Sequence, residues 1–282
     1  EIAAVKPAPI LVNFLIYPGP MGAAWIDYLV ADAVVAPAEY ARHSYLSKLL
    51  VMPATYQVNY YPREDYVRVG GTTAAGGGAA AGGGDHAPHT PKRAAVDPRF
   101  ENATDMDVDD PCEACAAASF VFCNFNKNDK LDPESFATWM NVLRAVPGSI
   151  LWMLAPSRAA GNGGAILRNL RREAAARGVS QARLVFAPRR TKRAHLERMR
   201  HADLFLDSFV YGAHSTATDA LRGGLPVLTV RGDNFASRVA TSLLLNVGVP
   251  EIGAASVKVY ERVAVMLARG AMQRHRRWRN GG

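Results

Sequence analysis

Basic and hydroxyl-bearing side chains follow several of the strands that the sequence predicts in the second half of the chain. Lys130 follows one such strand, and His195 and Arg198 lie three residues apart on a helix that follows another. The segment 212–216, which contains His214, lies between a third strand and a helix. Because ligands of a parallel sheet bind at the carboxyl ends of its strands, we expect these side chains to lie at one edge.

The residue types at this edge suit a phosphorylated ligand. The backbone N–H groups of 212–216 would point at a ligand on the helix N-terminus, where the helix dipole favours negative charge. The hydroxyls of Ser215 and Thr216 add donors, and Lys130 adds a point charge. Asp219, one turn into that helix, is placed to accept from sugar hydroxyls.

Other classes of ligand lack support in the sequence. There is no GxGxxG after the first strand and no GxxxxGK[ST], which argues against a nicotinamide dehydrogenase or a P-loop nucleotidase. The net charge is +8, from 33 Lys and Arg against 25 Asp and Glu. The basic stretches lack interleaved aromatic residues, so we do not expect a nucleic-acid-binding protein.

Strands and helices are expected to alternate along the second half of the chain. Asp132 as N-cap and Pro133 at the first helical position predict a helix that Pro147-Gly148 ends. Alternation of this kind is typical of a doubly wound parallel α/β domain. The expected strands are 9–16, 119–124, 149–154, 183–186, 204–206 and 226–230, and the later helices are 165–177, 191–200, 216–222, 235–246 and 257–268.

The chain of 282 residues is long enough for one large domain or two small ones, and 49% of its residues are apolar. Its apolar runs fall short of the roughly 20 residues of a membrane span. The sequence shows no signal peptide and no initiator Met, so we expect a fragment. Residues 64–116 contain a Gly/Ala-rich run at 70–84 and an acidic stretch, and we interpret them as a disordered linker or insertion.

The cysteines and acidic residues near the insertion do not predict a metal site. Cys112 and Cys115 form a CxxC, but Cys123, His86 and His89 do not complete a standard zinc spacing. The acidic residues at 105–110 lack EF-hand spacing and are interpreted as a solvated loop. We therefore interpret the cysteines as unrelated thiols.

Motifs along both halves of the chain resemble those of protein O-linked N-acetylglucosamine transferases, the O-GlcNAc transferase/SPINDLY family with its plant-type branch. The resemblance covers nearly everything outside the insertion. Its motifs are Lys6-Pro7-Ala8-Pro9-Ile10, Tyr17-Pro18-Gly19, Met52-Pro53, Phe122-Cys123-Asn124-Phe125-Asn126, Lys130, Arg144-Ala145-Val146-Pro147, Leu151-Trp152-Met153-Leu154, Gly212-Ala213-His214-Ser215-Thr216 and Ala236-Ser237-Arg238-Val239-Ala240.

The resemblance implies a GT-B type fold and a defined reaction. Residues 1–63 would be the tail of the first Rossmann-like lobe, 64–116 the insertion, and 117–282 most of the second, nucleotide-sugar-binding lobe. Members move N-acetylglucosamine from UDP-GlcNAc to Ser or Thr hydroxyls of proteins, with inversion and without a metal. The resemblance further implies protein acceptors, a cytoplasmic or nuclear location, and no nucleic-acid or membrane partner.

Site roles follow from the resemblance by position. Lys130 matches the lysine that contacts the diphosphate and supports its departure, and we predict Lys130 and His214 as catalytic residues. Because a lysine and a helix N-terminus can stabilise a departing UDP, we predict no metal and no other cofactor. The predicted donor-binding residues are Lys192 and Asp219 at the ribose, His195 and Arg198 at the uridine side, and His214, Ser215 and Thr216 at the phosphates.

This sequence also departs from the family pattern. Lys127 stands where Gln is usual, Arg190 lies near a position whose backbone reads the uracil, and Ser215 replaces Thr. The family's tetratricopeptide repeats are absent, as is the early first lobe with its proposed catalytic base. We therefore expect this chain alone to bind donor weakly and to transfer little sugar.

Two alternatives remain open. One is a protein O-fucosyltransferase that uses GDP-fucose, a branch in which the phosphate loop is threonine-rich and the ribose acid is usually Glu. His214 and Asp219 favour the UDP-GlcNAc side. The other alternative is a non-catalytic nucleotide-sugar-binding pseudoenzyme, which a transfer assay would distinguish from an enzyme.

Overall fold

The computed structural model describes residues 2–15, 17–61, 114–115, 117–156 and 163–279. The expected insertion, 64–116, lies outside the described residues except for 114 and 115, and its disorder stays a prediction. The domain limits stay predictions as well. None of the helices in the described part of the chain combines the length and apolarity that crossing a bilayer requires.

The first part of the chain forms a small parallel sheet in the order β1-β2-β3. Its strands are β1 (Val12–Asn13), β2 (Tyr28–Asp32) and β3 (Lys48–Met52), and helix α1 (Ala38–Ser44) connects the last two. The prediction of a buried strand over 9–16 was wrong, because β1 has only two residues and Val12 is 47% exposed. The backbone turns away at Leu15, whose φ is 63°.

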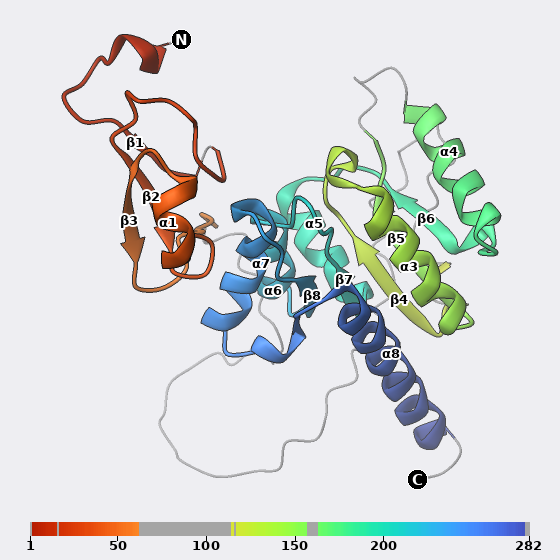
Figure 1. Ribbon diagram of the computed structural model, residues 1–282. Coiled ribbons are helices and arrows are strands. Elements are labelled where there is room, and N and C mark those ends of the chain that lie inside the picture. The colour runs from red at the N-terminus through yellow and green to blue at the C-terminus, as the bar shows by residue number, and fades with distance from the viewer. Residues whose placement is uncertain (1, 16, 62–113, 116, 157–162, 280–282) are drawn as a thin grey trace, which may run out of the picture.

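The second part, as described, forms a parallel sheet of six strands in the order β6-β5-β4-β7-β8-β9, with helices beside it (Figure 1). The chain starts at the centre, at β4, moves outward through β5 and β6, and then returns to the other side of β4 at β7. The strands are β4 (Phe120–Asn124), β5 (Ser149–Leu154), β6 (Leu184–Ala187), β7 (Leu204–Leu206), β8 (Val227–Val230) and β9 (Gly253–Ala254).

Alternate strand residues face opposite sides of this sheet, and both sides are covered. Phe120 and Phe122 of β4 belong to a core that α3 (Pro133–Ala145) and α8 (Val257–Arg279) share, and α4 (Gly163–Ala176) also contributes to it. Val121 and Cys123 belong to a second core with α6 (Ser215–Arg222) and α7 (Phe235–Asn246). The predicted doubly wound α/β fold is therefore confirmed.

Most of the predicted helices begin or end at local signals. Asp132 caps α3 by accepting a hydrogen bond from the backbone of Ser135, as predicted. Gly148 and Gly178 follow α3 and α4 with φ of 77° and 75°, a conformation that glycine adopts without strain. Helix α5 (Lys192–Arg198) is shorter than predicted because a 3₁₀ turn, η7 (Met199–His201), replaces its end. Helix α8 continues to Arg279, whereas the prediction ended it at 268.

The first part of the chain packs against α7 of the second part. The carboxylate of Asp32, at the end of β2, accepts hydrogen bonds from the backbones of Val34, Val35 and Tyr56 and from the hydroxyl of Ser242 on α7. The ring of Tyr56 meets that of Phe235 edge to face, with centroids 5.0 Å apart. These contacts bury Asp32 almost completely, at 3% exposure.

Candidate functional site

The predicted site residues lie near the point where the strand order reverses. Strands β4 and β7 are adjacent, and the segments that follow them lead to opposite sides of the sheet. Parallel α/β proteins bind ligands at such a switch point. Lys130 lies in the 3₁₀ turn η4 (Asn128–Lys130) after β4, and the loop 207–214 follows β7. The Lys130 Nζ atom donates to the carbonyl of Gly212 at 2.8 Å, so the two segments meet.

Among the residues that the structure describes, the N-terminus of α6 has donors without a partner at this edge. His214 is its N-cap residue but makes no side-chain capping hydrogen bond, whereas side chains cap α3, α5 and α7. Ser215 is exposed and Thr216 is half-buried, and neither hydroxyl has a hydrogen-bond partner among the described residues. An uncapped helix start of this kind can bind an anion through its N–H groups and dipole.

Lys130 is partly buried beside this helix start. Burial lowers the pKa of Lys130 to about 8, and the carboxylates of Asp207 and Asp129 limit that fall. At neutral pH the side chain is therefore largely an ammonium. The ammonium has three N–H donors, and Gly212 takes one of them. The remaining donors are available to an oxygen ligand at this edge.

His214 is neutral at pH 7, because burial lowers its pKa to about 4. Its Nε2 atom lies 2.9 Å from the carbonyl of Ala236 and must donate to it, since a carbonyl only accepts. The proton is thus on Nε2, and Nδ1 carries a lone pair. In this state His214 adds no positive charge to the site, so charge stabilisation there depends on Lys130 and the start of α6.

Asp207, the residue directly after β7, organises the loop 207–214. The fully buried carboxylate accepts hydrogen bonds from the backbones of Ser208 and Ala213, the amide of Asn126 and the hydroxyl of Thr229. Burial raises the pKa of Asp207 to about 6. Its position directly after β7 was the available signal, but its partners could not be read from the sequence.

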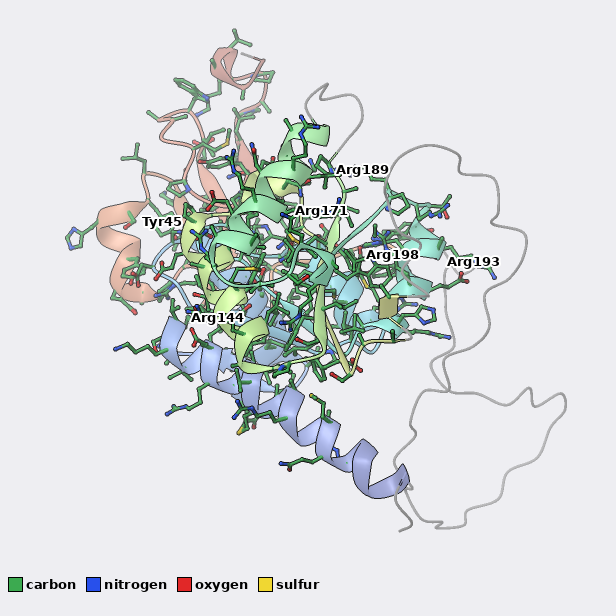
Figure 2. All side chains as sticks on the ribbon, turned by 90° about the vertical axis from the view of Figure 1, so that its right-hand side faces the viewer. Tyr45, Arg144, Arg171, Arg189, Arg193 and Arg198 are labelled. Carbon is green, nitrogen blue, oxygen red and sulfur yellow. The ribbon has the colours of Figure 1, made fainter. Side chains whose placement is uncertain are left out.

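His195 and Arg198 lie together on α5, as their spacing predicted. The Arg198 Nη2 atom donates to the His195 Nδ1 atom at 2.5 Å, and Arg198 also donates to the carbonyl of Pro188. Burial, with the nearby cations Arg198 and Lys192, lowers the pKa of His195 to about 3, so the imidazole is uncharged. Phe125, after β4, lies edge-on to His195. Figure 2 labels Arg198 beside the more peripheral Arg193 of the same helix.

Lys192 and Asp219 form an ion pair, with the Lys192 Nζ atom 2.5 Å from both carboxylate oxygens. The sequence did not reveal that the first part of the chain joins this pair. The Tyr61 hydroxyl donates to the Asp219 Oδ1 atom at 2.8 Å, and the Asn59 amide contacts the same oxygen at 3.4 Å. The Asp219 side chain is 7% exposed. The predicted ribose acid thus also contacts the segment after β3.

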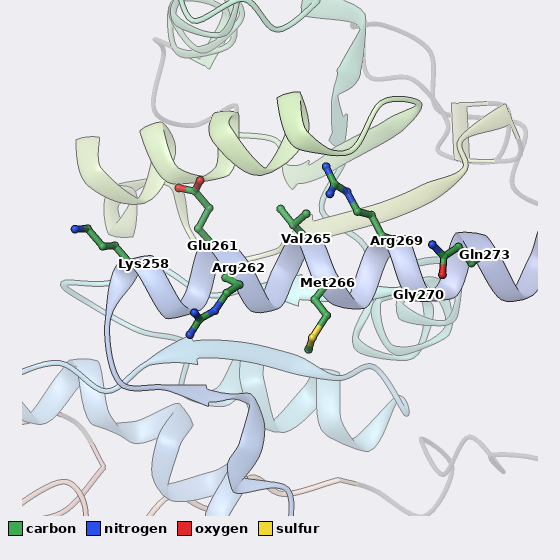
Figure 3. Close-up of a pocket in the computed structure, with 8 residues that line it drawn as sticks. All are labelled: Lys258, Glu261, Arg262, Val265, Met266, Arg269, Gly270 and Gln273. Carbon is green, nitrogen blue, oxygen red and sulfur yellow. The ribbon is translucent and has the colours of Figure 1, made fainter.

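Other chemistry-bearing groups do not extend the site. Cys115 and Cys123 are buried, while Cys112 lies outside the described residues. Within the described ranges, no three His, Cys, Asp or Glu side chains are grouped as metal ligands. A groove of about 670 Å³ runs along α8, and Figure 3 shows Glu261 and Arg269 on the side that faces α3. Its lining includes none of the predicted site residues.

A doubly wound lobe with an anion-suited helix start at its switch point is typical of α/β proteins that bind phosphorylated ligands. The structure of a mutant O-GlcNAc transferase from Thermobaculum terrenum superposes on this chain with a TM-score of 0.70 and 24% sequence identity. The superposition covers 98% of this chain and 45% of the Thermobaculum terrenum chain. That similarity confirms the predicted GT-B fold class.

The chain belongs to glycosyl transferase family 41, whose sequence profile matches residues 1–63 and 113–279. It is 34% identical to the probable UDP-N-acetylglucosamine–peptide N-acetylglucosaminyltransferase SEC of Arabidopsis thaliana over 95% of this chain and 23% of that protein. It is 28% identical to the UDP-N-acetylglucosamine–peptide N-acetylglucosaminyltransferase of Caenorhabditis elegans over 96% of this chain and 29% of that protein. The chain thus spans about a quarter of the length of these relatives.

Proposed function

We propose that this chain carries the donor-binding part of a protein O-GlcNAc transferase. The proposed reaction moves N-acetylglucosamine from UDP-GlcNAc to Ser or Thr hydroxyls of proteins, with inversion and without a metal. The family membership and the activity named for the relatives support this donor and acceptor class. The observation that carries the proposal is the convergence of Lys130 with the uncapped start of α6 at the switch point.

In the proposed reaction, the acceptor oxygen bonds to C1 of the sugar while the bond from C1 to the β-phosphate oxygen breaks. The acceptor proton passes to a base, and UDP leaves with an additional negative charge. Lys130 uses one N–H donor on the Gly212 carbonyl, and its other donors would stabilise the charge that develops on the leaving UDP. The hydroxyls of Ser215 and Thr216, at the start of α6, would bind the phosphates. The nucleoside would be bound by Lys192, Asp219, His195 and Arg198. His214 would lie next to the phosphates as a neutral imidazole.

Nucleotide binding tests the proposal directly. Calorimetry in EDTA should show UDP binding at least about tenfold more tightly than GDP. Equal affinities, tighter GDP binding, or binding only with Mg²⁺ would overturn it, and tighter GDP binding would favour the GDP-fucose alternative. A parallel assay follows GlcNAc transfer from UDP-GlcNAc to a Ser/Thr-rich peptide under single-turnover conditions, by a full-length family 41 protein that carries this chain. UDP binding with no detectable transfer by that protein would favour the non-catalytic alternative.

We also propose protein acceptors and a cytoplasmic or nuclear location, which the resemblance implies. The acceptor class is supported by the names of the relatives, which are peptide N-acetylglucosaminyltransferases. Fluorescence microscopy of the tagged protein in its own cells tests the location, and signal confined to the secretory pathway would contradict it.

A further inference from the structure

The Tyr211 ring contacts both of the predicted catalytic side chains, Lys130 and His214. The Lys130 Nζ atom lies 4.1 Å from the centroid of the ring, close enough for a cation–π contact. The imidazole of His214 stacks on the same side chain, with centroids 5.0 Å apart and planes 21° apart. One aromatic side chain thus contacts both groups.

The backbone around Tyr211 is held from several sides. The Ser208 hydroxyl donates to the Tyr211 carbonyl at 2.8 Å, and the Asn234 amide donates to the Val210 carbonyl at 3.1 Å. The backbone N–H of Gly212 donates to the carbonyl of Ala236. These bonds fix where the ring stands, so its contacts with Lys130 and His214 follow from the loop geometry.

The ring face, and not the hydroxyl, makes these contacts. Among the described residues the Tyr211 hydroxyl has no hydrogen-bond partner, and the side chain is 36% exposed. Burial is the main cause that raises the pKa of Tyr211, so the phenol is uncharged at neutral pH. Phenylalanine should therefore replace tyrosine here with little loss, whereas an aliphatic side chain should not.

We propose that Tyr211 is a positioning residue, whose ring holds the Lys130 ammonium and the His214 imidazole toward the donor diphosphate, an inference that rests on the proposed function. Lysine has a flexible four-carbon stem, and Gly212 fixes its ammonium through only one hydrogen bond. The electron-rich ring face adds a second, directional attraction that also stabilises the charged form. The charged or titratable groups that act on Lys130 are Asp207, Asp129, Lys127, Tyr211 and His214.

The first test measures the Lys130 ammonium itself in the full 282-residue chain. Carbon-13 NMR of the lysine side chains, with Lys130 assigned from a Lys130→Arg variant, follows its titration. Tyr211→Leu should lower the pKa of Lys130 by about half to one pH unit, because the cation–π contact is lost. Tyr211→Phe should restore the parent value. Val210→Ala, a neighbour whose side chain is largely exposed, is the matched control and should leave the titration unchanged.

The second test measures UDP affinity by calorimetry at pH 8, where Lys130 of the parent protein is about half charged. Because less of its Lys130 is charged at this pH, Tyr211→Leu should weaken UDP binding about two- to threefold, and Tyr211→Phe should match the parent protein. If Tyr211→Leu does not fold, as judged by its thermal transition, Tyr211→Gln repeats both measurements.

The outcomes separate this proposal from the proposed function. An unchanged Lys130 titration in folded Tyr211→Leu would refute the positioning role, and so would a Phe variant that behaves like the Leu variant. If the titration shifts as expected but no variant binds UDP, the contact between Tyr211 and Lys130 stands and the proposed function fails.

Discussion

Replacing Lys130 with alanine should lower turnover far more than it weakens UDP binding. Negative charge on the diphosphate grows as the bond to the sugar breaks, so the ammonium contributes most in the transition state. Removing one preorganised electrostatic contact of this kind typically costs on the order of 10² to 10³ in kcat. We expect UDP affinity to fall by no more than about tenfold, because the start of α6 still binds the phosphates.

The pKa of Lys130 adds a pH signature to this prediction. With a pKa of about 8, the parent side chain is charged in about nine tenths of molecules at pH 7 and about one tenth at pH 9. The charged form is lost as pH rises, so parent turnover should fall about tenfold between these values. Turnover of Lys130→Ala should lack this step, because the titrating group is gone.

The assay is single-turnover GlcNAc transfer from UDP-GlcNAc by a full-length family 41 protein that carries this chain, paired with UDP calorimetry. Lys258→Ala is the matched control, since it removes an exposed lysine on α8 away from the site. Lys130→Met, which keeps more of the side-chain volume but cannot donate to the Gly212 carbonyl, shows whether the space left by alanine accounts for the loss. If kcat stays within about threefold of the parent while UDP binding collapses, Lys130 acts only as a ground-state anchor and our reasoning is refuted.

Two further predictions concern the scaffold. Asp32→Ala should lower the free energy of unfolding by about 3 kcal/mol, because three backbone N–H groups and the Ser242 hydroxyl lose their acceptor. Ser242→Ala should lower the free energy of unfolding by only about 1 kcal/mol. Urea denaturation measures both values, and an equal loss in the two variants would contradict this prediction. Gly212→Ala should weaken UDP binding about tenfold, since its Cβ would lie 3.0 Å from the Asp207 carboxylate and 3.2 Å from the Ala236 carbonyl. Unchanged calorimetry would show that the loop tolerates the methyl group.

The sequence predicted best those elements whose ends depend on neighbouring residues. Asp132 and Pro133 start α3, and the bounds of α7 agree with the prediction, because caps and periodicity are local. The strand expected at 9–16 failed for the opposite reason. An apolar run predicts burial only if something packs on it, and Phe14 and Leu15 are partly exposed in the structure.

The candidate site shows the same division. Strand order and the carboxyl-end rule were enough to expect Lys130 near residues 212–216, because topology alone brings those segments together. Neither rule specifies side-chain partners. The stacking of Tyr211 on His214, and its contact with Lys130 81 positions earlier in the chain, depend on the path of one loop.

Asp207 and Asp219 show why long-range partners decide what an acid does. Both follow β7 along the chain, yet Asp207 is fully buried and accepts hydrogen bonds from four donors, whereas Asp219 pairs with Lys192 and accepts a hydrogen bond from Tyr61. A carboxylate with that many buried donors holds a loop in place, because removing it would leave each donor unpaired. Tyr61 precedes Asp219 by 158 positions, so no local pattern could report their contact. Because the predicted ribose acid contacts the segment after β3, the first part of the chain and the predicted nucleoside site share one carboxylate.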